Sequence, residues 1–296
     1  MGRRWQHRLC AGFVGVAVNS AAHLPLSAGA IARPDDFYYA TLYLAPAARH
    51  RLRVLEALRR AITDIPGNCS DRGVAHLKLT WWHAELQQLA AGSARHPLTQ
   101  PLLPLVQAQP DLLGLFEALL DATINGLNQA PLADHAALLA WLQRQQGALL
   151  AHYIDCGAAV SAAQRQALAE LAAMLELVYA LRGLRQHRRA TPLLLPAATL
   201  SAARLNGDAV RGAYSSASLQ VVLQAEIDWL RAQLLARCAA LPRKLRRGQR
   251  LFVTLAACAI EALALTRADN CQVLERRVEL LPLRKLWLAW RVAQWG

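Results

Sequence analysis

Residues that favour β-strands are scarce in this chain of 296 residues, which has only 4 Phe and 6 Tyr, whereas Ala and Leu supply much of its apolar content. Ala and Leu are strong helix formers, so a large β-sheet would have to be built from poor strand material. From Pro46 onward, apolar residues recur at helical spacing, beginning with Val54, Leu58 and Ile62. The sequence therefore predicts an all-α fold.

Breaks in this periodicity divide the chain into helices. Pro66 and Gly67 end the first long helix, and Asp71 is suited to cap the N-terminus of the next one. We expect helices over 74–91, 111–127, 134–155, 161–189, 215–240, 243–266 and 281–294. The sequence contains no internal repeat, and no low-complexity linker separates these helices. Residues 35–296 are therefore predicted to form a single domain.

Residues 1–34 have the outline of a secretory signal. Arg3, Arg4 and Arg8 precede an apolar stretch at 9–18, and small residues at 28–30 resemble a cleavage site. The alternative is an N-terminal extension from a misassigned start, with the domain opening near Asp35. We favour this alternative slightly, and with it a cytoplasmic protein, because the six Cys form no CxxC pair and nothing downstream is typical of secretion. The sequence leaves open whether the protein is exported. No continuous apolar run reaches the ~18 residues of a membrane span.

The chain is strongly basic, with 33 Lys and Arg against 20 Asp and Glu and a formal net charge of +13. Such a charge suits an anionic partner, either nucleic acid, acidic lipid headgroups or a phosphate-bearing ligand. No zinc-finger spacing or aromatic RNA-binding strand is visible, so we expect no nucleic-acid partner. Five cations lie within 243–250, which is either a solvated helix start or an anion-binding cluster.

Several segments, in order and spacing, resemble the squalene/phytoene synthase family. The likeness covers nearly the whole chain from residue 35, and its combination of segments carries more weight than any single one. The segments are 37–44 (FYYATLYL), 69–86 (CSDRGVAHLKLTWWHAEL), 96–98 (HPL), 193–196 (LLLP) and 282–291 (PLRKLWLAWR).

This resemblance implies an isoprenoid-synthase-type helical bundle around a long apolar cavity, in which two prenyl diphosphates are joined head to head. In the family, two acidic motifs on facing helices hold Mg²⁺ against the diphosphates. Mg²⁺ requires oxygen ligands, and carboxylates four residues apart share one face of a helix.

The chain departs from the family at both acidic motifs. The first should fall at 63–67, where the ligand positions are Thr63 and Gly67 and Asp64 is the only acid. The second should follow Arg182, where the acidic positions are Gly183 and His187. No acid lies between Glu176 and Asp208, and the surrounding cations Arg182, Arg185, Arg188 and Arg189 are candidates for phosphate binding instead.

Two hypotheses follow from this pattern. The first is a non-catalytic descendant without a metal, which binds an isoprenoid diphosphate, an anionic lipid at the membrane periphery, or a protein partner. A mitochondrial respiratory complex I assembly factor that shares the fold and also departs from the acidic motifs is a precedent by resemblance. The second hypothesis is an active, Mg²⁺-dependent prenyltransferase with remodelled ligands. The absence of carboxylates at 63, 67, 183 and 187 favours the first.

The final helix raises one further alternative. Trp287 and Trp290, with Arg284 and Arg291, have the composition of a membrane-interface helix. The family likeness of this segment favours packing of both Trp side chains inside the fold instead.

Overall fold

The computed structural model describes residues 35–154, 160–187 and 193–295, with only the backbone for 145–149, 151, 186, 187 and 295. Within these ranges every regular element is a helix and no strand occurs. The all-α prediction is therefore confirmed.

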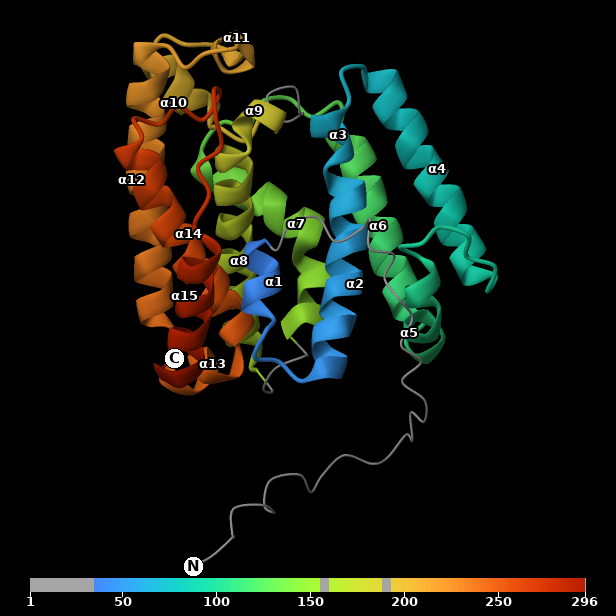
Figure 1. Cartoon of the computed structure of the whole chain (residues 1–296). Coiled ribbons are helices and arrows are strands. Elements are labelled where there is room, and N and C mark those ends of the chain that lie inside the picture. Colours follow the sequence, from blue (N-terminus) through green and yellow to red (C-terminus); the bar gives the residue numbers. More distant parts are fainter. Residues whose placement is uncertain (1–34, 155–159, 188–192, 296) are drawn as a thin grey trace, which may run out of the picture. The chain divides into compact units, whose positions relative to one another are not determined.

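Eight long helices build the fold (Figure 1). They are α2 (Pro46–Thr63), α4 (Arg72–Ala90), α6 (Asp111–Gly126), α7 (His135–Ile154), α8 (Ala162–Arg182), α12 (Ala217–Ala240), α14 (Arg250–Ala268) and α15 (Pro282–Trp295). Short helices connect or flank them: α1 (Asp36–Ala40), α3 (Ile65–Asn68), η1 (Gln100–Leu102), α5 (Leu103–Ala108), α9 (Leu184–His187), α10 (Ala197–Ala202), α11 (Gly207–Arg211) and α13 (Arg243–Gly248).

The helix boundaries agree with the sequence pattern to within two residues except at three places. Helix α2 ends at Thr63, before Pro66 and Gly67, and these two residues lie inside the short helix α3. The helix expected over 161–189 ends at Arg182, with Gly183 as its C-cap, and α9 follows. The helix expected over 243–266 is divided at Gln249, whose ψ of 47° is not helical, into α13 and α14. Asp71 caps α4 as predicted, because its carboxylate accepts a hydrogen bond of 2.9 Å from the Val74 amide.

Helices α8 and α14 lie at the centre of the bundle. Helix α8 contacts α7, α12 and α14, while α14 contacts α1, α8, α12 and α15. Helix α2 packs on α6, and α6 in turn contacts α4 and α7. One large apolar core runs through these contacts, and its most fully buried large side chains include Phe116, Leu55 and Leu79.

Helix α14 is also the one described helix that is long and apolar enough to cross a membrane, by length and composition alone. Here half of its most apolar window is buried against protein. Its contacts with α1, α8, α12 and α15 are those of a core helix.

Candidate functional site

The two degenerate motifs converge at one end of α2 and α8. Thr63 is the last residue of α2, and Gly67 lies in the short helix α3 that follows it. Gly183 caps α8, and His187 ends α9, which contacts α3. The backbone therefore brings the four family ligand positions into neighbouring elements. The side chain of His187 and all of Arg188 and Arg189 lie outside the described residues.

A phenol contacts Asp64, the one acid of these motifs, and two cations lie against the ring of that phenol. The Tyr179 hydroxyl of α8 lies 3.5 Å from the Asp64 carboxylate. The guanidinium carbons of Arg60 and Arg277 lie 5.6 Å and 5.2 Å from the centre of the Tyr179 ring. Burial, followed by the negative charge of Asp64, raises the pKa of Tyr179, so this phenol stays protonated near neutral pH.

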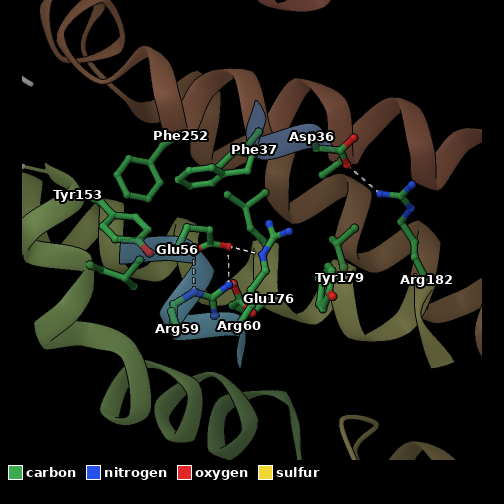
Figure 2. Close-up of a pocket in the computed structure, with 16 residues that line it drawn as sticks. Asp36, Phe37, Glu56, Arg59, Arg60, Tyr153, Glu176, Tyr179, Arg182 and Phe252 are labelled. Carbon is green, nitrogen blue, oxygen red and sulfur yellow. Dashed lines mark hydrogen bonds and ion pairs between the residues drawn. The ribbon is translucent and has the colours of Figure 1, made fainter. Parts of the chain in front are cut away.

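A small cavity of about 90 Å³ lies between α1, α2, α7, α8 and α14 (Figure 2). Phe37, Phe252 and Leu150 are among its apolar lining residues, while Glu56 and Arg59 are among its charged ones. A water molecule occupies about 30 Å³ of liquid, whereas pockets for small organic ligands measure roughly 300–1,000 Å³. This cavity is therefore far smaller than the long apolar cavity that the family resemblance implies.

Glu56 is the centre of a buried ion-pair network beside this cavity (Figure 2). Arg59 donates two hydrogen bonds to its carboxylate, at 2.7 Å and 2.8 Å, and Tyr153 of α7 donates another at 2.7 Å. Arg59 also forms an ion pair of 3.1 Å with Glu176 of α8, and Arg60 binds Glu56 from the outer side. The network thus joins α2, α7 and α8 through fully paired charges.

The charges of this network hold Glu56 ionised. Burial acts to raise the pKa of the Glu56 carboxyl, but the positive charges of Arg59 and Arg60 and the hydrogen bonds from Arg59 and Tyr153 outweigh burial and lower the pKa to about 2. Glu56 and Arg59 are only 6 % and 4 % exposed, so solvent screens their attraction little.

A second group of ion pairs closes the cavity at the Arg182 end. Arg182 is buried and binds Asp36 of α1 at 3.0 Å, Glu279 at 3.2 Å and the carbonyl oxygen of Val278 at 3.1 Å. Lys285 of α15 approaches the same two carboxylates, at 2.8 Å from Asp36 and 3.3 Å from Glu279. Burial opposes the ionisation of Asp36, yet Arg182 and Lys285 lower its pKa below the ordinary value.

These contacts bear on the predicted phosphate-binding arginines. Arg182 is engaged by carboxylates inside the fold, and a phosphate would have to compete with them. Arg185 is exposed and donates to the carbonyl oxygen of Glu275. Phosphate binding by this cluster stays a prediction.

Comparison with known proteins identifies the family to which this helical fold belongs. The family model for squalene/phytoene synthase matches residues 33–284. The chain belongs to the squalene/phytoene synthase family. Squalene synthase HpnC from Alicyclobacillus acidocaldarius shares the fold with a TM-score of 0.57 and 16 % identity, over 80 % of this chain and 89 % of that one. A dehydrosqualene synthase crystallised with a ligand gives a TM-score of 0.66 and 14 % identity, over 88 % and 91 % of the two chains. A search of curated proteins found no match.

The squalene/phytoene synthase fold implies Mg²⁺, and the residues of this chain do not fit it. Asp64 is the single carboxylate of the two motifs, and it accepts a hydrogen bond of 3.5 Å from the Tyr179 hydroxyl. The acids that line the cavity are Asp36, Glu56 and Glu176, and each is ion-paired to a cation. No group of three or more His, Cys, Asp or Glu side chains able to hold a metal occurs in the described part of the chain. Mg²⁺ requires several oxygen ligands, which this set does not offer.

Sequence reasoning missed the acids that line the cavity described above. Glu56 precedes Arg59 and Arg60 by three and four residues, which is the spacing of ion pairs on one helix face, and this signal was available in the sequence. Asp36 lies 146 positions from Arg182, and no local pattern links the two.

Proposed function

We propose that this chain is a non-catalytic member of the squalene/phytoene synthase family that acts as a binding or assembly protein rather than as a prenyltransferase. The observation that carries the proposal is the Glu56–Arg59–Glu176 network, in which a buried guanidinium joins α2 and α8 one helical turn before Thr63. Because Arg59 pairs with both carboxylates, neither Glu56 nor Glu176 is free to bind Mg²⁺.

The size of the cavity supports the same proposal. About 90 Å³ is too small for two prenyl chains, which need at least the volume of an ordinary ligand pocket. Opening the space would require the ion pairs between α2 and α8 to part, and breaking a buried pair costs about 3–5 kcal/mol. Prenyl diphosphates would therefore have to overcome this energy before binding inside the bundle.

Family membership favours a second candidate, an active head-to-head prenyltransferase with remodelled ligands. In this alternative Asp64 would hold Mg²⁺ with help from the diphosphates of the substrates. The proximity of α3 and α9, which carry parts of both motifs, is the structural observation in its favour.

A turnover assay separates the two candidates. We expect no Mg²⁺-dependent release of pyrophosphate from farnesyl or geranylgeranyl diphosphate, because the part of the chain that the structure describes has no cluster of acidic side chains to bind the metal. The assay should include a family member that retains both acidic motifs as a positive control. Pyrophosphate release that disappears with EDTA and in Asp64→Asn would overturn the proposal and establish the second candidate.

A further inference from the structure

Helix α15 has two apolar sides, and only one of them is covered by protein. Leu288, Ala289 and Val292 are buried in the contact with α14. The opposite side, here named the α15 face, is exposed, with Leu283 at 80 %, Trp290 at 44 % and Trp287 at 39 %. The α15 face consists of Leu281, Leu283, Leu286, Trp287 and Trp290.

This exposure corrects the expectation that the two Trp side chains pack inside the fold. Residues 283, 286, 287 and 290 follow the spacing of one helix face, so they form a continuous stripe rather than scattered apolar positions. Five large apolar side chains within ten residues indicate a surface that contacts something else. Helix α4 exposes a smaller apolar set, Val74, Leu77 and Trp81.

Cations border this stripe. The guanidinium carbons of Arg284 and Arg291 lie 4.5 Å and 4.6 Å from the centre of the Trp287 ring. Helix α15 contains no Asp or Glu. Helix α13, with the exposed Arg243 and Lys244, also packs on α14, and Figure 1 shows it at the same end of the bundle as the C-terminal end of α15.

We propose that the α15 face docks on the surface of a bilayer that contains anionic lipid, with the helix lying in the membrane plane. Leu and Trp side chains would enter the boundary between headgroups and acyl chains, and Arg291 would extend to the phosphates. Arg284 forms an ion pair of 3.0 Å with Glu261 of α14, so a phosphate would compete with that carboxylate for it. The 14 residues of α15 span about 21 Å, which is short of the ~30 Å hydrocarbon core, so the helix lies on the membrane and does not cross it. This inference goes beyond the proposed function, and it does not depend on whether the cavity inside the bundle binds a ligand or supports catalysis.

Charge complementarity favours an anionic bilayer over a second copy of the chain as the partner of the α15 face. A two-fold contact through the α15 face would bring Arg284 and Arg291 of each copy near the same face of the other, in a chain whose net charge is +13. An anionic bilayer meets these cations with opposite charge, and each Lys or Arg near such a surface contributes about 1 kcal/mol to binding.

Vesicle sedimentation of the full chain tests the proposal. We expect binding to vesicles of equal parts phosphatidylcholine and phosphatidylglycerol, weak binding to phosphatidylcholine alone, and a loss of affinity as salt is raised. The double variant Leu283→Gln/Trp290→Gln should lower affinity about tenfold or more, because both side chains lose apolar area that enters the membrane. Arg291→Gln with Arg243→Gln should reduce affinity for the anionic vesicles and flatten its salt dependence.

Helix α4 supplies matched controls. Leu77 is 70 % exposed and Arg72 is exposed, and α4 lies on the opposite side of the bundle from α15 in Figure 1. Leu77→Gln and Arg72→Gln should leave vesicle binding unchanged. Circular dichroism and thermal melting should show every variant folded, since exposed substitutions rarely alter stability much.

Three outcomes would overturn the inference. One is the absence of binding to anionic vesicles at low salt. Another is equal binding by the α15 and α4 variants, which would assign membrane affinity to another part of the chain. The third is a stable dimer in solution that the α15 variant converts to a monomer, which would make a second copy the occupant of the α15 face.

Discussion

Replacement of Arg59 by Met is expected to lower the free energy of unfolding by about 3–5 kcal/mol. The substitution keeps the length of the side chain and removes the cation that pairs Glu56 with Glu176. Glu176 would then lose its ion pair with Arg59, and Glu56 would keep only Arg60 and Tyr153, so part of the desolvation penalty of both carboxylates would appear in the folded state. Urea unfolding followed by circular dichroism measures the change.

Two further variants give this experiment its controls. Arg231 lies in the middle of α12 and is exposed, so Arg231→Met should change stability by no more than about 0.5 kcal/mol. The triple variant Arg59→Met/Glu56→Leu/Glu176→Leu should recover much of the loss, because apolar residues of similar volume often replace buried ion pairs without net cost. A loss below about 1 kcal/mol in Arg59→Met would show that the network contributes little.

Acid should destabilise the protein over a defined range of pH. The pKa of Glu56 is lowered from its ordinary value of 4.5 to about 2 in the folded state. A lowered folded-state pKa gives stability that is complete above pH 4.5 and is lost as pH falls toward 2. The shift corresponds to about 3 kcal/mol, and Asp36, whose pKa is also lowered, acts in the same direction.

Urea unfolding at a series of pH values between neutrality and pH 2 measures this loss. Glu56→Gln should be less stable than the original chain at neutral pH, yet its stability should fall less on acidification, because the titrating group is gone. If both proteins lose the same free energy between pH 4.5 and pH 2, other carboxyls cause the acid sensitivity.

The helical architecture could be predicted because apolar spacing, Pro and Gly breaks and caps such as Asp71 are local signals. The break at Gln249 was missed although Gly248 precedes it, because a single Gly inside a helical pattern is often tolerated. The side-chain amide of Gln249 also donates a hydrogen bond to the carbonyl oxygen of Ile154, a tertiary contact that the local sequence does not reveal. The convergence of the two motif segments is consistent with the family likeness. The charges that occupy the cavity were not foreseen, because Glu176 and Tyr153 meet Glu56 only after three helices have assembled.

The contacts of α1 with α14 and α15 have a consequence during synthesis. Helix α1 is made well before the two helices that cover it. At about 5–20 residues per second, the nascent chain must hold α1 without these partners for on the order of tens of seconds. Phe37 and Tyr39, which are buried in the finished fold, lack this part of their cover throughout that interval. The core around α1 therefore cannot be completed until α14 and α15 have been made, and a chaperone could bind α1 before then.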